Sequence, residues 1–484
     1  MDEKILIYEK SVPGRTGYTL PDTEKPADKI LSAIPEGMRR TSDAALPEVA
    51  EPEVMRHFVA MSVKNHHIDK GFYPLGSCTM KYNPKQNDAA ASFKGFREQH
   101  PLAPCGASNA NLQLMWELSQ YLGEVSGFDA MSLQPVAGAH GEFCGLLIMR
   151  AYHVANNDTK RQKIIIPDSA HGTNPASVTS VGYTTVQIES GPDGIITPEA
   201  VEAVMDDEVA GMMLTNPNTL GLFESNIEEI SRIVHEGGGL MYMDGANLNA
   251  NMGVFRPGKT GFDIMHFNLH KTFSTPHGGG GPGAGAVGVV AKLEPFLPFP
   301  VLEKNGDDKL FFNYDRPQSI GRLSTFYGNF GNMVRAYTYI KTLGGQGLRQ
   351  VSENAVINAN YLKELLREDY DLPHERHCMH EFVISGNRQK KLGVKTSDIS
   401  KRLLDFGVHA PTNYFPLIVP EAMMIEPTET ESRETLEEFA VIMKQIAREA
   451  EIEPDTVREA PHNTPVRRMD EISAARQLDI AYLD

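Results

Sequence analysis

The residues with the clearest chemical potential are a lysine and an aspartate, each placed at the end of an apolar run. Lys271 lies in Asn-Leu-His-Lys-Thr-Phe-Ser-Thr-Pro-His (268–277), and Asp244 ends Leu-Met-Tyr-Met-Asp (240–244). A lysine amine forms Schiff bases with aldehydes, and an aspartate can keep a pyridine nitrogen protonated so that the ring accepts electrons. A lone lysine after a strand is more often an ordinary surface residue. Lys271, Asp244 and the glycine-rich segment 278–283 together indicate a site for pyridoxal 5'-phosphate.

A second segment, Gln-Pro-Val-Ala-Gly-Ala-His-Gly-Glu (134–142), leads directly into an apolar helical stretch. Small residues at a helix N-terminus expose backbone N–H groups and the positive end of the helix dipole, and both attract phosphate. We therefore predict that Gly138 and Ala139 let the cofactor phosphate approach and that His140 donates to it. Taken alone, the segment is more typical of a plain strand-to-helix turn, so this assignment depends on Lys271.

A histidine, His171, follows the apolar run 164–166, which is a candidate for a buried strand. A side chain at the end of that strand reaches the same crevice as Lys271. A flat imidazole there can stack on the cofactor ring and transfer protons near neutral pH. A purely structural histidine is an alternative of about equal weight when His171 is considered by itself.

Two other patterns suggest sites that we do not predict. The glycine run 278–281 lacks the GxxxxGK[ST] and GxGxxG spacings of nucleotide-binding loops, and we interpret it as tight backbone packing behind the lysine. His374, His377 and His380, with Cys378 among them, resemble a metal-binding cluster. Their segment is charged and far along the chain from Lys271, so no metal site is predicted.

Secondary structure must bring the chemically interesting residues together. Beyond about residue 108, short apolar runs alternate with helical patterns, which predicts an α/β fold with a mostly parallel sheet covered by helices on both faces. Helices are expected at about 108–125, 141–156, 354–368, 396–406 and 429–449, and also from Thr197-Pro198 and from Asn226 with a capping box. Strands are expected at 163–166, 184–188, 211–215, 240–243, 264–267, 286–290 and 380–385. Ligands bind outside the carboxyl ends of such strands, so Asp244 and Lys271 should face one crevice.

Changes in composition along the chain predict four parts. Residues 1–85 are rich in proline, glycine and charge and read as an extended arm that wraps its own body or a neighbouring subunit. Residues 86–340 are expected to form the large cofactor-binding domain, and 341–460 a smaller α+β domain. The polar residues 461–484 read as a tail.

The composition excludes several classes of protein. The chain has 484 residues, of which 41% are hydrophobic and 23% charged, as in ordinary globular proteins. A net charge of −17 argues against a nucleic-acid partner, because phosphate backbones need clustered Lys and Arg. Four scattered cysteines without a CxxC pair, and no signal-like N-terminus or long apolar run, predict a cytoplasmic protein with no membrane span.

Several long motifs resemble the glycine decarboxylase P-protein family of the glycine cleavage system. They occur in the expected order and are specific, and together they span most of the chain: 76–81 (Gly-Ser-Cys-Thr-Met-Lys), 134–142, 169–175, 244–247, 268–283 and 424–429. A full-length P-protein is about twice as long and has two homologous halves. This chain resembles the C-terminal half, which is the pyridoxal phosphate-bearing subunit 2 of the two-subunit bacterial form.

The resemblance implies a fold-type-I enzyme that decarboxylates glycine and transfers the aminomethyl group to the lipoyl group of the H-protein. It also implies a partner, P-protein subunit 1, in a heterotetramer with two copies of each chain. By motif, Lys271 is the Schiff-base residue, His171 stacks on the ring, Asp244 pairs with the ring nitrogen and Ala246 packs beneath it. His270 joins the loop Gly138–His140 in contacting the cofactor and its phosphate.

Two alternatives stay open. One is another fold-type-I enzyme, such as an amino-acid decarboxylase or a cysteine desulfurase, which the long motifs disfavour. The other is a non-catalytic partner subunit of the same fold, which the presence of Lys271, Asp244 and His171 disfavours.

Overall fold

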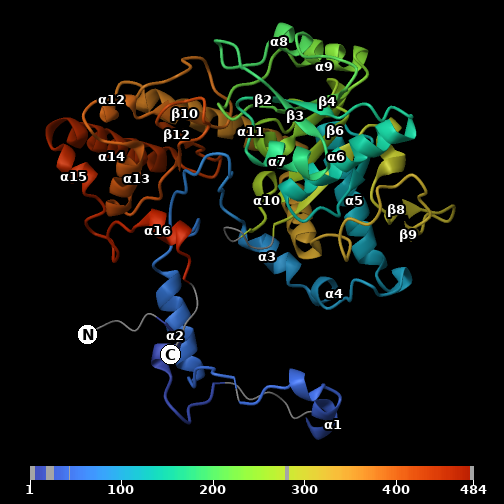
Figure 1. The fold of residues 1–484 in the computed structure, drawn as a ribbon, viewed down its shortest axis with the longest axis horizontal. Coiled ribbons are helices and arrows are strands. Elements are labelled where there is room, and N and C mark those ends of the chain that lie inside the picture. Colours follow the sequence, from blue (N-terminus) through green and yellow to red (C-terminus); the bar gives the residue numbers. More distant parts are fainter. Residues whose placement is uncertain (1–5, 18–26, 43, 278–282, 480–484) are drawn as a thin grey trace. The chain divides into compact units, whose positions relative to one another are not determined.

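The computed structural model describes residues 6–17, 27–42, 44–277 and 283–479. They form two compact units, Met1–Lys70 and Gly71–Asp484, which we describe separately (Figure 1). The smaller unit contains α1 (Ala27–Ser32) and α2 (Glu51–Ser62). The start of α2 is stabilised by the Glu53 carboxylate, which accepts a hydrogen bond from the Ala50 N–H at 2.9 Å and complements the helix dipole.

The larger unit is built on a seven-stranded sheet with the strand order β1-β7-β6-β5-β4-β2-β3. Strands β2 to β6 are parallel, and β7 is antiparallel to its neighbours β1 and β6. The strands are β1 (Ala130–Ser132), β2 (Lys163–Pro167), β3 (Thr184–Ile188), β4 (Val209–Thr215), β5 (Leu240–Asp244), β6 (Ile264–Asn268) and β7 (Gly285–Val289). Every residue of β4 to β7 is buried, as expected for strands covered on both faces.

Helices cover both faces of this sheet (Figure 1). The helices of the larger unit are α3 (Lys85–Ala91), α4 (Lys94–Arg97), α5 (Asn109–Ser126), α6 (Gly138–Ala155), α7 (Thr173–Ser180), α8 (Pro198–Glu202), α9 (Ile227–Glu236), α10 (Leu269–Thr272), α11 (Phe330–Leu366), α12 (Asn387–Lys390), α13 (Thr396–Asp405), α14 (Arg433–Ile452), α15 (Pro454–Arg458) and α16 (Glu471–Arg476).

Alternate side chains of the central strands belong to two separate hydrophobic clusters, one on each face. Met212 and Leu214 of β4 and Met243 of β5 share a cluster with residues of α5, α9 and α11. Met213 of β4 and Tyr242 of β5 share the other cluster with residues of α6 and α7. This period of two is the pattern that a strand imposes on its side chains, and it directs the even-numbered residues of β5 toward α6.

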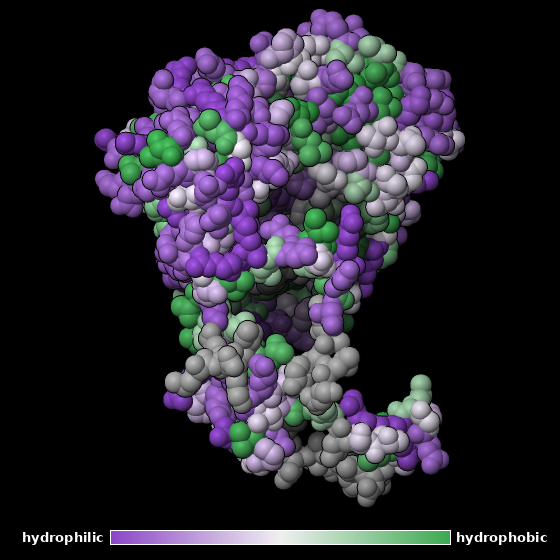
Figure 2. Space-filling view, turned by 60° about the vertical axis from the view of Figure 1, so that its left-hand side comes forward, coloured by the Kyte–Doolittle hydropathy of each residue, from purple (hydrophilic) through white to green (hydrophobic). Residues whose placement is uncertain are grey.

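The C-terminal part of the larger unit has its own antiparallel sheet, ordered β10-β12-β11, and its own core. Its strands are β10 (Phe382–Ser385), β11 (Thr412–Asn413) and β12 (Ala422–Ile425), and a separate hairpin is formed by β8 (Val301–Lys304) and β9 (Leu310–Asn313). The core side chains come from β10, β12, α13, α14 and the second half of α11. Figure 2 shows a mostly hydrophilic face with scattered hydrophobic residues, which agrees with the acidic composition.

The predicted fold class is confirmed, and two local predictions are wrong. The helix expected at 354–368 begins much earlier, at Phe330, and Gly344 inside it has φ 63°, which breaks the helical pattern in the sequence. Asn226 does not cap α9 with its side chain; its amide instead donates to the Ile196 carbonyl at 2.9 Å. The glycine run 278–281 lies outside the described residues.

The proposed division into four parts remains a proposal. Contacts divide the chain after Lys70, so residues 71–85 belong with the larger unit rather than with the smaller one. Within the described part of the chain, none of the helices has the length and hydropathy needed for a transmembrane span.

Candidate active site

A cavity of about 240 Å³ lies where β4, β5 and β6 end, at Thr215, Asp244 and Asn268. All of the predicted site residues except His140 line it: Gly138, Ala139, His171, Asp244, Ala246, His270 and Lys271. His140 is not among the lining residues; its Nδ1 accepts a hydrogen bond from the Val136 N–H at 3.3 Å. The carboxyl ends of parallel strands meet at one edge of the sheet, which explains why residues far apart in sequence share this cavity.

Asp244 is almost completely buried at the end of β5, with 2% of its surface exposed. Its Oδ1 accepts from the Ala246 N–H at 2.9 Å and lies 3.2 Å from His266 Nε2, and its Oδ2 accepts from Asn174 Nδ2 at 3.0 Å. Burial by itself raises the pKa of Asp244, but His266, these hydrogen bonds and Lys271 outweigh burial and hold the pKa below its usual value. The cavity therefore has a charged carboxylate in its wall.

Lys271 lies in the short helix α10, directly after β6. Its ammonium donates a hydrogen bond of 2.7 Å to the Ser77 carbonyl, which belongs to a segment 194 residues away in sequence. The next residue is also tied to that segment, because the Thr272 carbonyl accepts from Lys81 Nζ at 2.7 Å. The cavity lysine is thus held by a segment that no local sequence pattern connects to it.

His171 is partly buried just before the N-terminus of α7. Hydrogen bonds through Thr173 to Glu142 orient its ring. Its Nδ1 lies 2.9 Å from Thr173 Oγ1, and that hydroxyl donates to Glu142 Oε1 at 2.7 Å. Burial is the largest effect on the pKa of His171 and lowers it; Lys271 acts in the same direction, whereas Asp244 and Glu142 oppose it. The ring is therefore neutral near pH 7, and it lines the cavity.

The N-terminus of α6 forms another wall through Ala137, Gly138 and Ala139. A Cβ atom at Gly138 would lie only 2.8 Å from Asn268 Cγ, so a larger residue here would force the Asn268 side chain or the helix end to shift. The helix extends to Ala155 and is long enough for its dipole to favour an anion at this end.

His270 and Ala246 also line the cavity. His270 Nδ1 lies 3.0 Å from the Ala284 carbonyl, and burial together with nearby Lys271 lowers its pKa to about 4. His270 is therefore neutral at physiological pH. Ala246 is fixed beside Asp244 by its backbone N–H.

Several lining residues were not predicted, and some of them carry a signal in the sequence. Thr215 and Asn268 are polar residues at strand ends, as Asp244 is, and among the described residues neither Thr215 Oγ1 nor Asn268 Oδ1 has a hydrogen-bond partner. His266 is a histidine within an otherwise apolar strand, and its Nδ1 lies 3.0 Å from the Tyr242 hydroxyl. Glu142 stands in the predicted phosphate segment.

The histidines considered for a metal do not form one cluster. Among the described residues, the groupings with metal-like geometry join His380 with Glu381 and Glu426, and Glu142 with Asp244 and His266. Neither includes His374, His377 or Cys378. His380 is fully buried, with Nε2 at 3.9 Å from Glu381 Oε1 and 3.8 Å from Glu426 Oε1.

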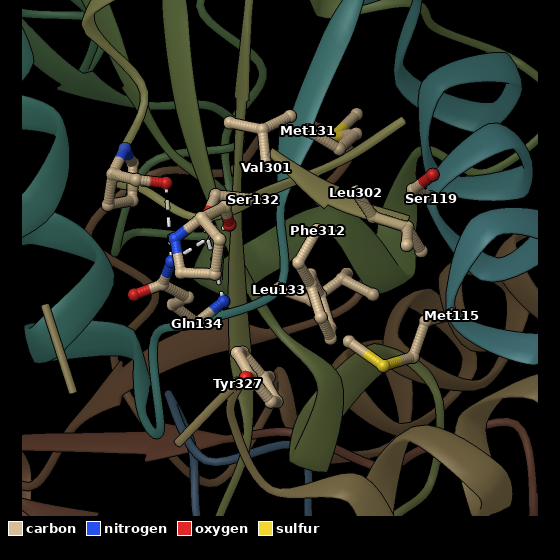
Figure 3. Close-up of a pocket in the computed structure, with 12 residues that line it drawn as sticks. Met115, Ser119, Met131, Ser132, Leu133, Gln134, Val301, Leu302, Phe312 and Tyr327 are labelled. Carbon is tan, nitrogen blue, oxygen red and sulfur yellow. Dashed lines mark hydrogen bonds between the residues drawn. The ribbon is translucent and has the colours of Figure 1, made fainter. Parts of the chain in front are cut away.

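A smaller cavity of about 50 Å³ lies between α5, β1 and the β8–β9 hairpin and contains none of the predicted site residues (Figure 3). Gln134 lies at its edge and donates from Nε2 to the carbonyls of Pro298 and Pro300 at 3.2 and 3.4 Å. Its Oε1 accepts from the Leu323 N–H at 3.3 Å. Gln134 therefore anchors the start of the segment that leads into α6.

Two family models match the chain. The model described as "Glycine dehydrogenase, C-terminal domain" matches residues 351–467, and the model "Aminotransferase class-V" matches residues 147–284. Among solved structures, a glycine decarboxylase (P-protein) of the glycine cleavage system has a TM-score of 0.74 at 19% identity, covering 89% of this chain and 100% of that one. A cysteine desulfurase from Thermococcus onnurineus has a TM-score of 0.61 at 15% identity, covering 78% and 95%. These identities support the fold alone.

Curated relatives extend over nearly the whole chain. A probable glycine dehydrogenase (decarboxylating) subunit 2 from Bacillus velezensis is 56% identical over 480 residues, covering 99% of this chain and 98% of the relative. A protein of the same name from Chloroherpeton thalassium is also 56% identical, covering 99% and 97%. The chain therefore belongs to the family of glycine dehydrogenase (decarboxylating) subunit 2 proteins.

Proposed function

We propose that this chain is the pyridoxal phosphate-bearing subunit of a glycine decarboxylase. The observation that carries the proposal is the meeting of Lys271 and charged, buried Asp244 in one cavity, in a chain of the subunit 2 family. The geometry supports roles for the predicted site residues that line the cavity, whereas His140 does not line it.

The cavity residues fit pyridoxal phosphate in three respects. Asp244 offers a carboxylate to a protonated pyridine nitrogen, and Lys271 offers a primary amine to an aldehyde. The N-terminus of α6, with glycine at 138, offers a cradle for phosphate. Thr215 Oγ1 and Asn268 Oδ1 are polar atoms without partners among the described residues, and both residues line the cavity, where a polar ligand would satisfy them.

The chain's own residues divide the chemistry between them. Pyridoxal phosphate, when bound, supplies an electron sink for the electron pair left by the loss of carbon dioxide. Asp244 holds a proton at the pyridine nitrogen, because a charged carboxylate favours the protonated form of a nearby base. His171 stacks against the ring and is kept in place by Thr173 and Glu142. Lys271 would hold the cofactor through its primary amine, which is the same kind of group that glycine offers.

The partners are part of the proposal. The family name "subunit 2" supports a second, different subunit, which we infer to be P-protein subunit 1 in an assembly with two copies of each chain. The lipoyl group of the H-protein is the proposed acceptor of the aminomethyl group. A permanent assembly of this kind buries more than about 2,000 Å² of surface. The chain on its own should therefore self-associate, and with subunit 1 present it should bind that subunit tightly.

One experiment tests the function and its alternatives together. The chain is purified with and without subunit 1 and assayed for exchange of labelled carbon dioxide into glycine in the presence of lipoylated H-protein. We expect exchange only when both subunits and H-protein are present. Desulfuration of cysteine, or decarboxylation of an amino acid at the same rate with and without H-protein, would favour a different fold-type-I enzyme. Failure to bind pyridoxal phosphate would favour a non-catalytic subunit.

A further inference from the structure

The segment that holds Lys271 contains a strained turn. Ser77 and Thr79 have φ angles of 64° and 46°, in the left-handed region that residues other than glycine rarely adopt. Such a conformation costs free energy and persists only where the surrounding structure enforces it. Gly76, just before the turn, packs so closely on Met424 that a Cβ atom would overlap it.

Two buried glutamates enforce the turn, one at each strained residue. Glu381 Oε2 accepts from the Ser77 N–H at 2.8 Å, and Glu426 Oε2 accepts from the Thr79 N–H at 2.8 Å. Glu381 is 0% exposed and Glu426 1% exposed. Glu381 directly precedes β10, and Glu426 directly follows β12. Their neighbours Phe382 and Ile425 are paired between these two strands. The C-terminal sheet therefore presents both carboxyl groups to the turn as one rigid element.

The turn directs the Ser77 carbonyl at Lys271. Lys271 Nζ donates to this carbonyl at 2.7 Å, so the ammonium has a fixed acceptor at the edge of the cavity. Lys271 cannot use this acceptor in the same way while its nitrogen is bonded to a cofactor carbon. Because a cofactor lysine must leave and return in every cycle, a fixed acceptor keeps the free amine close to the place where it reacts.

We propose that Glu381 and Glu426 are positioning residues, which hold the Ser77–Thr79 turn so that the Ser77 carbonyl receives the Lys271 ammonium whenever that amine is not bonded to the cofactor. The proposal rests on the assignment of Lys271 as the cofactor lysine. It gives a role to the Gly-Ser-Cys-Thr-Met-Lys motif at 76–81, whose residues otherwise have no part in the proposed chemistry.

The charge state of the two glutamates agrees with this role. Burial, followed by repulsion from Glu426, raises the pKa of Glu381 well above its ordinary value, and burial raises the pKa of Glu426 to about 7. Neutral His380 lies beside both, at 3.9 and 3.8 Å. Glu381 is thus mainly a neutral acceptor for the Ser77 N–H, and glutamine at this position would keep that acceptor.

The test measures the reactivity of the free lysine in the full-length chain prepared without cofactor. The rate of acetylation of Lys271 by acetic anhydride is followed by mass spectrometry of the peptide that contains it. In Glu381→Met, which keeps the volume but removes the acceptor, the Ser77 carbonyl should no longer be held at the Lys271 ammonium. We expect acetylation roughly tenfold faster, because the ammonium then loses a hydrogen bond, and bonds to charged groups are the stronger ones. Glu381→Gln should restore the original rate.

A matched control is Glu224→Met. Glu224 is also 0% exposed and accepts a backbone N–H, that of Ile196 at 2.9 Å, but it does not touch the turn. Its variant should lose stability without changing the acetylation of Lys271. If Glu381→Met does not fold, Glu381→Asp replaces it, because the shorter side chain keeps the carboxyl group but loses its reach to Ser77.

Two results would overturn the proposal. One is an unchanged acetylation rate in a folded Glu381→Met or Glu381→Asp chain; the other is an equal acceleration in Glu224→Met, which would indicate general loosening. The experiment needs neither cofactor nor turnover, so its outcome is independent of the decarboxylase assignment. Absence of cofactor binding would reject the decarboxylase assignment, whereas the acetylation rates would still show whether Glu381 controls the reactivity of Lys271.

Discussion

Asp244 carries its charge in an almost fully buried place because four groups stabilise it: His266, Asn174, the Ala246 N–H and Lys271. Asn at this position keeps hydrogen bonding but cannot stabilise a protonated pyridine. We expect Asp244→Asn to retain pyridoxal phosphate while glycine–carbon dioxide exchange falls by about 10²-fold or more, the contribution typical of one acid–base group. Cofactor content is measured by absorbance in the same preparation. Normal exchange would show that another group protonates the ring.

At His171 the question is whether ring stacking or proton transfer matters more. The pKa of His171 is lowered, so the ring is neutral at physiological pH and can stack without charge. We expect His171→Phe to keep pyridoxal phosphate several-fold better than His171→Ala, as aromatic contacts contribute about 1 kcal/mol. Cofactor dissociation is followed by dialysis and absorbance. Equal retention in both variants would mean that the ring does not contact the cofactor.

Among the elements, the start of α6 has little room for change. A methyl group at Gly138 would press on the Asn268 side chain, at 2.8 Å from its Cγ, and overpacking of this kind typically costs about 1–3 kcal/mol. We expect Gly138→Ala to fold but to bind pyridoxal phosphate at least tenfold more weakly, because the helix end must shift. Gly106→Ala is the control, since nothing lies within 4 Å of a Cβ there. Equal binding by both variants would exclude a close approach at Gly138.

Lys81 joins four other segments of the chain at a single buried ammonium. Its Nζ donates to Asn249 Oδ1 at 2.8 Å, the Thr272 carbonyl at 2.7 Å, the Tyr339 hydroxyl at 3.1 Å and Glu429 Oε1 at 2.9 Å. Removing one partner of a buried ion pair leaves the other charge buried without a counter-charge, which costs about 3–5 kcal/mol.

We therefore expect Lys81→Met to lower the free energy of unfolding, measured in urea, by about that amount. Lys160→Met is the control. Lys160 forms an exposed ion pair with Asp207, and its loss should leave the urea midpoint unchanged. A Lys81→Met chain as stable as the original would mean that the ion pair is offset by its own desolvation.

For the molecule as a whole, buried carboxyl groups predict how stability varies with pH. Burial raises the pKa of Glu224 from 4.5 to about 7. Below pH 4.5 the Glu224 carboxyl is protonated in both the folded and the unfolded chain, and its contribution to the free energy of unfolding is fully present. Between the two values the unfolded chain releases the proton and the folded chain keeps it. The free energy of unfolding then falls with rising pH, by roughly 1.4 kcal/mol per pH unit for this group.

Glu224→Gln should remove this part of the slope. The measurement is urea unfolding of the original chain and the variant at several pH values between about 5 and 7. The difference between the two isolates Glu224, because Glu426 and Glu431, whose pKa values are also raised to about 7, contribute equally to both chains. Parallel pH profiles would show that Glu224 is ionised in the folded state.

Much of the fold and of the site could be predicted because it depends on local patterns. Apolar runs of strand length, separated by helical periodicity, determine an α/β sheet, and the polar residue that ends each run marks the ligand edge. Lys271 and Asp244 were found in this way, and Gly138 was found from the small residues that precede a helix; all three line the cavity. The early start of α11 was missed because Gly344 interrupts its helical pattern.

Only the tertiary structure decided which distant residues support the site. Glu381 meets Ser77 across 304 residues, and Lys271 meets the same turn across 194. His266 lies against Asp244 because β5 and β6 are neighbours in the sheet, and a strand's neighbours follow from the packing of the whole chain rather than from its own residues. The amino-acid sequence by itself therefore determined the reactive groups and the elements that carry them. The three-dimensional packing determined the groups that orient them and set their charge.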